Sequence, residues 1–151
     1  NFETLFSSNE CNDAFTGGAI TISKEKKLYF STGSSDWKIN SRQKAQDDNS
    51  INGKINELDL GSKDYRIYSK GHRNPLGLLF VKGDILLSAE HGAFGGDEIN
   101  KIVDGGNYGW PISSYGEYYD FHLSGKSKIS NEYDKIRNDK WAKAGPCKIS
   151  E

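Results

Sequence analysis

The chain has 151 residues, of which 34% are apolar, and its 20 basic and 21 acidic side chains give a formal net charge of −1. This length allows one domain with its own core, and the 12% aromatic content favours folding over disorder. The chain has no basic field for nucleic acid and no apolar run near the roughly 20 residues of a membrane helix, so we expect neither partner.

The two ends of the chain leave several questions open. Cys11 and Cys147 could pair in an oxidising compartment and close nearly the whole chain into a loop, or both could be unpaired. The spacing of two cysteines does not decide whether they form a disulfide.

The first residues, NFETLF, lack the basic and apolar regions of a signal peptide and are typical of the middle of a protein. We expect a signal, if one exists, to be removed or to lie upstream.

Seven short strands are predicted in chain order, because short runs of β-branched, aromatic and other apolar residues alternate with charged or glycine-containing turns. Six of them form hairpins and one stands alone: residues 19–22 with 28–31, 51–60 with 65–68, 74–81 with 85–88, and then 98–103. From residue 116 onward the chain is polar, and we predict either an irregular segment or the start of a further unit.

The hairpins repeat a pattern. The first and third each have a glycine, an apolar strand, a short polar turn, a second apolar strand and a small polar exit. Repeated hairpin units with loop insertions are typical of β-propeller blades. The near-continuous apolar runs at 76–81 and 85–87 favour strands that are covered on both faces, as in blades packed against blades. We therefore predict an all-β chain, with a propeller favoured over a sandwich or a β-meander.

The stretch from 71 to 111 is dense in glycine beside charged and polar residues, which marks unusual backbone or close approach of the backbone to another group. Pro75 restrains Asn74 to extended geometry, so His72, Arg73 and Asn74 should be displayed as a turn before the strand. The planar guanidinium of Arg73 suits a carboxylate ligand. Alternatively, Arg73 forms a structural ion pair.

A second polar loop follows the next strand. His91 could act there as a base, a ligand or a hydrogen-bond donor, or could be structural. The glycine-rich backbone from 92 to 96, next to Asp97 and Glu98, could supply carbonyl oxygens to Ca²⁺. The loop has no EF-hand spacing, and the three histidines lack zinc spacing. The segment GGNYGWP (105–111) should be a structural corner in which Tyr108 and Trp110 pack against the neighbouring sheet.

Three motifs in order, GHRNPLG (71–77), EHGAFGGDEIN (90–100) and GGNYGWP (105–111), resemble the soluble quinoprotein glucose/sorbosone dehydrogenase family. The upstream segments GGAI, LYFSTG, AQD and GKI are similar to the same family in the same order, and the resemblance covers about residues 17–115. It implies a six-bladed β-propeller that binds pyrroloquinoline quinone (PQQ) and Ca²⁺. On this length, the partial propeller over 1–151 should contain about three of the six blades.

The resemblance also implies roles for six residues of the two loops. PQQ is a tricarboxylate, which an arginine can bind. The implied roles are PQQ contacts for Arg73, Asn74 and His91, Ca²⁺ binding through the backbone carbonyls of Gly92 and Ala93, and a position near the catalytic base for Asp97.

The chain also departs from the family pattern. The family's general base is a histidine just before the first strand, and the matching position is Phe15 or close to it. A phenyl ring cannot accept a proton, and loss of a general base typically costs ~10²–10⁴-fold in rate. Leu76 replaces a glutamine, Ala93 replaces a proline, and the lysine and arginine that later blades contribute have no counterpart here.

Two functions follow from the resemblance. The first is a fragment of a PQQ- and Ca²⁺-dependent dehydrogenase, periplasmic or secreted, that passes hydride from a sugar or alcohol hydroxyl to the quinone and then electrons to an external acceptor. The second is a non-catalytic propeller that binds a ligand or a protein. A purely structural β-domain is a third possibility. Open blade faces would be covered by the remaining blades or by a second copy, and we favour a fragment.

Overall fold

The computed structural model describes residues 2–10, 16–34, 42–82 and 84–116. All seven predicted strands are present, with bounds shifted by a few residues: β1 Gly17–Ile22, β2 Lys27–Thr32, β3 Lys54–Asp59, β4 Tyr65–Lys70, β5 Pro75–Val81, β6 Ile85–Glu90 and β7 Glu98–Ile102. A short 3₁₀ helix, η1 Lys44–Gln46, lies between β2 and β3. Among the described residues, no helix has the length and apolar content to cross a bilayer.

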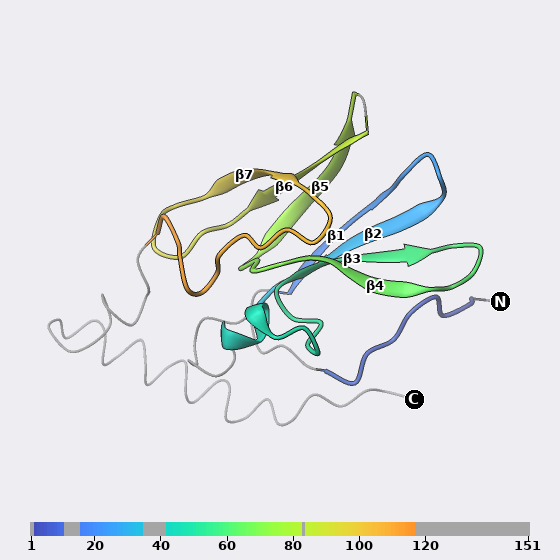
Figure 1. The fold of residues 1–151 in the computed structure, drawn as a ribbon, viewed down its shortest axis with the longest axis horizontal. Helices are drawn as coiled ribbons and strands as arrows, with labels where there is room; N and C mark the ends of the chain where they lie inside the picture. The colour runs from blue at the N-terminus through green and yellow to red at the C-terminus, as the bar shows by residue number, and fades with distance from the viewer. Residues whose placement is uncertain (1, 11–15, 35–41, 83, 117–151) are drawn as a thin grey trace, which may run out of the picture.

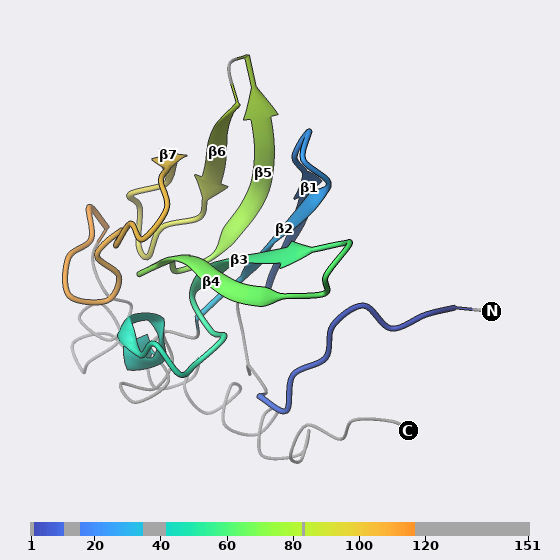
Figure 2. The same ribbon diagram turned by 45° about the vertical axis from the view of Figure 1, so that its right-hand side comes forward.

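The strands form two antiparallel sheets. One has the order β1-β2-β3-β4 and the other the order β5-β6-β7. The first strands of the two sheets, β1 and β5, lie side by side, and the other strands fan away from them (Figures 1 and 2). The first two predicted hairpins share one sheet because β2 pairs with β3 along its whole length. The described residues therefore make one four-stranded and one three-stranded sheet, where about three blades were expected.

The main core lies between the two sheets. Alternate residues of a strand point to the same face, so one face of each sheet supplies apolar side chains to this interface. The ring of Tyr29 meets those of Tyr68 and Phe80 edge-on, at centroid distances of 5.0 and 5.2 Å. The buried cluster consists of Tyr29, Ile55, Leu86 and Ile102, with Tyr68, Leu78, Phe80 and Tyr108 packed against it.

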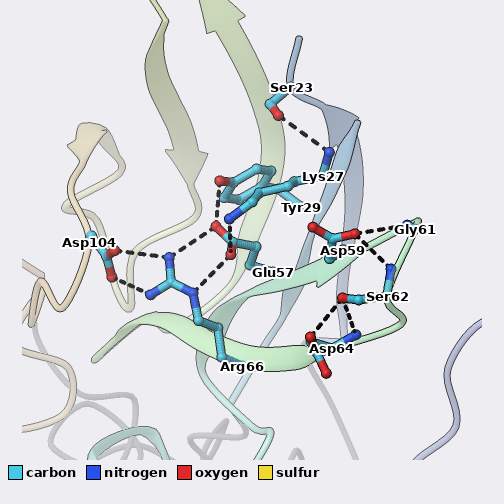
Figure 3. A network of polar contacts seen from close by, with 10 residues as sticks. All are labelled: Ser23, Lys27, Tyr29, Glu57, Asp59, Gly61, Ser62, Asp64, Arg66 and Asp104. Atoms are coloured by element: carbon cyan, nitrogen blue, oxygen red, sulfur yellow. Dashed lines mark hydrogen bonds and ion pairs between the residues drawn. The ribbon is translucent and has the colours of Figure 1, made fainter. Parts of the chain in front are cut away.

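A buried carboxylate of the first sheet binds an arginine that links this sheet to the residue after β7 (Figure 3). Glu57 of β3 accepts hydrogen bonds from Tyr29 Oη at 2.5 Å, Arg66 Nε at 2.8 Å and Lys27 Nζ at 3.0 Å. Arg66 also donates to both oxygens of Asp104, which follows β7, at 2.6 and 2.9 Å. Burial favours the neutral acid, but the donors outweigh it and lower the pKa of Glu57 to about 2.

The segment after β7 returns to the outer edge of the first sheet. Lys70 N donates to Gly106 O at 2.9 Å, and Tyr108 N donates back to Lys70 O at 2.9 Å. The side-chain amides of Gln46 and Asn107 pair with each other at 2.7 and 3.0 Å. Because these bonds join the corner to both η1 and β4, the predicted structural role of GGNYGWP is confirmed.

Candidate functional site

The two polar loops that the sequence singled out lie together at one end of the second sheet. Pro75 and Glu90 are partners in the β5–β6 pairing, so the loop before β5 and the loop after β6 start next to each other. His91 N donates to Asn74 O at 3.0 Å, and Arg73 Nη1 donates to His91 O at 2.8 Å. The structure thus brings four predicted residues, Arg73, Asn74, His91 and Gly92, into one place.

The residues before Pro75 are not displayed as a turn, and that prediction is wrong. His72, Arg73 and Asn74 have exposed fractions of 0%, 3% and 6%. They carry the chain from the first sheet into the second, so they pass through the interface between the sheets. Their backbone pairs with loops of the first sheet on the way, with His72 N donating to Gly53 O at 3.1 Å.

Arg73 and Asn74 have distinct surroundings. The guanidinium of Arg73 lies over the ring of Trp110, 5.6 Å from its centroid, which is a favourable cation–π position. Asn74 Oδ1 accepts from Gly17 N at 3.2 Å and so joins the loop before β5 to the start of β1. Arg73 is therefore a cation held in a buried, aromatic-lined position, and Asn74 links the site to the neighbouring blade.

His91 and Asp97 are exposed on the rim of the site. Their side chains are 52% and 72% exposed, and His91 Nε2 lies 3.8 Å from Asp97 Oδ1. The same oxygen of Asp97 accepts from Gly92 N at 2.9 Å, which closes the loop on itself. Asp97 thus has a visible structural role in the loop besides facing the imidazole.

Gly92 and Ala93 lie beneath this rim. A Cβ atom on Gly92 would stand 2.3 Å from the carbonyl oxygens of Gly95 and Gly96, so no larger residue fits. Ala93 is 1% exposed and clusters with Ala45 and Trp110. Among the described residues, no group of three or more His, Cys, Asp or Glu side chains is placed to hold a metal ion. Ca²⁺ takes 6–8 oxygens, so two carbonyls would need further ligands.

The site has one small cavity and one larger groove. The cavity, between Arg73 and Trp110, holds about 20 Å³, which is room for a water molecule. The groove on the other side of the loop holds about 490 Å³, the size of a small-molecule site. The groove mixes apolar and acidic side chains with one imidazole: Leu76, Ala89, Glu90, His91, Asp97, Glu98 and Ile99.

Sequence reasoning missed a buried pair behind the loops. Glu90 was read only as the neighbour of His91, and His72 only as part of a turn, yet the two side chains meet at 2.5 Å. The pairing of Pro75 with Glu90 brings the crossing segment that carries His72 next to the end of β6, and this pairing has an irregularity between Pro75 and Gly77. The sequence carries no direct signal for that bulge beyond Gly77 itself.

Several predictions fall on positions outside the described residues. These are Phe15 at the place of the family's base, the pairing of Cys11 with Cys147, and the segment from 117 to 151. They remain predictions.

The sequence and the fold of this chain are both similar to those of known sugar dehydrogenases. Residues 1–142 match the model of a family described as Glucose / Sorbosone dehydrogenase. Quinoprotein glucose dehydrogenase B of Acinetobacter calcoaceticus is 45% identical over 67 residues, which are 44% of this chain and 14% of that protein. Aldose sugar dehydrogenase YliI of Escherichia coli K12 is 32% identical over 118 residues, covering 68% of this chain and 30% of that protein.

Solved structures similar to this chain are also sugar dehydrogenases. The PQQ-bound form of aldose sugar dehydrogenase from Streptomyces coelicolor has a TM-score of 0.65 and 32% identity, covering 74% of this chain and 34% of that one. The apo-form of the soluble E. coli aldose sugar dehydrogenase has a TM-score of 0.59 and 31% identity, covering 76% and 35%. The chain spans about a third or less of these relatives. The likeness confirms the predicted all-β propeller class.

Proposed function

Because the chain belongs to the glucose/sorbosone dehydrogenase family, we propose that it is part of a PQQ-dependent dehydrogenase that oxidises a sugar or a similar alcohol. The observation that carries the proposal is the pair of joined loops, with the buried guanidinium of Arg73 bonded to the backbone of His91. Relatives described as a quinoprotein and as a PQQ-bound enzyme support the choice of cofactor. Since the chain spans about a third of those relatives, the remaining blades would complete the site.

The residues of this chain would bind and orient the cofactor. PQQ, when bound, supplies an acceptor for the hydride that leaves the substrate carbon. Arg73 would hold a carboxylate of the cofactor, because a charge-assisted bond to arginine is strong where water is excluded. His91 would contact the cofactor from the exposed rim, and Asn74 would keep the loop aligned with β1 through its bond to Gly17.

A calcium ion fits the charge of the groove. The carboxylates of Asp97 and Glu98 line it, and two acidic side chains would repel a tricarboxylate unless a cation lay between them. We propose that the carbonyl oxygens of Gly92 and Ala93 contribute to such a Ca²⁺ site, with further oxygen ligands from the cofactor and other parts of the protein.

The proton acceptor separates two candidate functions. If Phe15 stands at the place of the family's base, Asp97 beside His91 is the acidic group left to help orient a proton acceptor at the rim. The alternative is a propeller that binds PQQ or another ligand without turnover, and the phenylalanine favours it. Dye-linked oxidation of aldoses by the complete protein discriminates: binding of PQQ without dye reduction supports the non-catalytic function.

Titration of the complete apo-protein with PQQ and Ca²⁺ tests the proposal. We expect a saturable absorbance change that Arg73→Ala weakens by at least about 30-fold, since removing one partner of a buried charged hydrogen bond costs about 2–5 kcal/mol. Arg66→Ala is the matched control, because Arg66 lies in the Glu57 network between the sheets and away from the loops (Figure 3). Absence of binding by the wild-type protein would contradict the proposal.

The same proposal places the protein in the periplasm or outside the cell, with an external electron acceptor. Cell fractionation of the native host checks the location. Recovery of the protein in the cytoplasm alone would be inconsistent with it.

A further inference from the structure

A buried carboxylate–imidazole pair lies directly behind the two loops of the candidate site. Glu90 is the last residue of β6, and His72 lies on the crossing from β4 to β5. Their exposed fractions are 8% and 0%, and His72 Nδ1 lies 2.5 Å from Glu90 Oε1. Neither residue has been given a role by the family resemblance.

Four polar groups of the protein surround the Glu90 carboxyl group. Oε1 lies 2.5 Å from His72 Nδ1 and accepts from Ser88 Oγ at 3.4 Å and from Asn100 Nδ2 at 3.2 Å, while Oε2 accepts from Arg73 N at 3.3 Å. The carboxyl group is therefore held by polar groups from β6, from β7 and from the segment that crosses from β4 to β5.

The imidazole of His72 is fixed on its other sides. Its Nε2 lies 2.8 Å from Ser69 Oγ of β4, and its ring stacks on that of Tyr108 at 4.7 Å. Ser69 belongs to the first sheet, and Tyr108 to the corner that returns to β4. The pair therefore connects the end of β6 to the first sheet and to the corner.

We propose that Glu90 and His72 are positioning residues, which hold Arg73 and His91 in the arrangement that binds the anionic cofactor. The inference rests on the proposed function. It follows from a continuous chain of contacts: Glu90 Oε2 holds Arg73 N, Arg73 Nη1 holds His91 O at 2.8 Å, and His91 follows Glu90 directly in sequence. A shift of the carboxylate would move both cofactor-facing residues together, and small displacements at a binding site are costly.

This arrangement needs an acceptor atom on both sides of the carboxyl group, because donors approach Oε1 and Oε2. In Glu90→Gln the amide has one oxygen and one NH₂ group. If the oxygen stays with His72, Ser88 and Asn100, the NH₂ group faces Arg73 N–H, donor against donor. Arg73 would then be pushed away from its place over Trp110.

The test is a PQQ titration of the complete protein carrying Glu90→Gln, with Glu57→Gln as a matched control. Glu57 is also a buried carboxylate of this sheet pair that accepts from several donors, but it lies in the network of Figure 3 and not behind the loops. We expect about 10–100-fold weaker PQQ binding for Glu90→Gln, the range typical of residues that orient a binding group. Both variants should lose thermal stability, while Glu57→Gln should bind PQQ as the wild type does.

The direction of the change in PQQ affinity distinguishes a positioning role of Glu90 from electrostatic repulsion of the cofactor. If Glu90 only repelled the cofactor's carboxylates, its neutralisation would tighten binding, and that result would overturn the inference. Equal affinity of Glu90→Gln and wild type would overturn it too. Failure of the wild type to bind PQQ would count against the proposed function instead, and then the pair would have no cofactor to position.

A milder variant covers the case in which Glu90→Gln does not fold. Asn100→Ala removes from the half-buried strand β7 the amide that donates to Glu90 Oε1 and to Glu98 Oε2, and it leaves the Glu90 carboxyl group in place. We expect about 2–10-fold weaker PQQ binding with the fold retained, since one net hydrogen bond contributes roughly 0.5–1.5 kcal/mol. Unchanged affinity in a folded Asn100→Ala protein would contradict the inference.

Discussion

At the scale of single residues, two buried carboxyl groups are held by donors from several elements. Of the glutamates that the structure describes, Glu57 and Glu90 are buried, and each is surrounded by donors from more than one element. Burial of a carboxylate is tolerated only where such donors replace water. Composition shows that the chain has glutamates, but only the packing of two sheets decides which of them become buried.

Glu57 should make the stability of the protein dependent on acid pH. Its pKa is lowered from 4.5 to about 2 in the folded state, so its contribution is present above pH 4.5 and is lost as the pH falls through 2. The loss should reach up to about 3 kcal/mol in the free energy of unfolding. Urea unfolding at several pH values between 2 and 5 measures it.

Two variants sharpen this measurement. Glu57→Gln should flatten the pH dependence in that window, and Tyr29→Phe, which removes one donor at 2.5 Å, should remove only part of it. A Glu57→Gln protein with the same acid dependence as the wild type would show that other carboxyl groups are responsible.

At the scale of elements, the crossing segments are as closely packed as the strands. Gly53 stands before β3 with a φ of +70°, and a Cβ there would lie 2.5 Å from Ala45 Cβ and 2.6 Å from His72 O. Its N–H and C=O bond to Gly33 and His72, so the crossing from β2 to β3 supports the crossing from β4 to β5. The backbone of the candidate site is thus held from below by η1 and by Gly53.

Gly53→Ala should therefore be strongly destabilising. A positive φ costs an L-residue about 1–2 kcal/mol, and forced overlap in a packed region adds about 1–3 kcal/mol. Gly105→Ala is the matched control, because Gly105 also has a φ of +70° but its Cβ would meet nothing within 4 Å. We expect a loss of about 2–5 kcal/mol for Gly53→Ala and about 1–2 kcal/mol for Gly105→Ala in urea unfolding. Equal losses would mean that the close approach does not matter.

At the scale of the whole molecule, the outer face of the second sheet is apolar and uncovered by the described residues. Leu76, Leu79 and Ile99 are 56%, 60% and 79% exposed. Such a face on a sheet with an open edge favours association. We expect the remaining blades of the complete protein to cover this face, including Leu76 and Ile99 at the groove beside the loops.

This face gives a prediction about the isolated chain. Expressed alone, the 151 residues should self-associate at micromolar concentration and bind an apolar dye, whereas the complete protein should do neither. Size-exclusion chromatography with light scattering measures this. The double variant Leu79→Lys and Ile99→Lys should reduce association, and a stable wild-type monomer of the isolated chain would contradict the prediction.

The sequence by itself determined the strands and the family. Each of the seven predicted runs became a strand, because β-branched, aromatic and other apolar residues between turn residues favour extended backbone. The motifs around Arg73 and His91 located the candidate site. One motif lies before β5 and the other after β6, and these two strands pair, so the loops lie side by side.

Only the tertiary structure decided what surrounds those residues. It buried Arg73 and Asn74, which the sequence predicted as a displayed turn, because their segment crosses the interface between the sheets. It also joined His72 to Glu90, 18 positions apart. Burial and pairing across sheets depend on which faces meet, and a strand's own sequence does not carry that information.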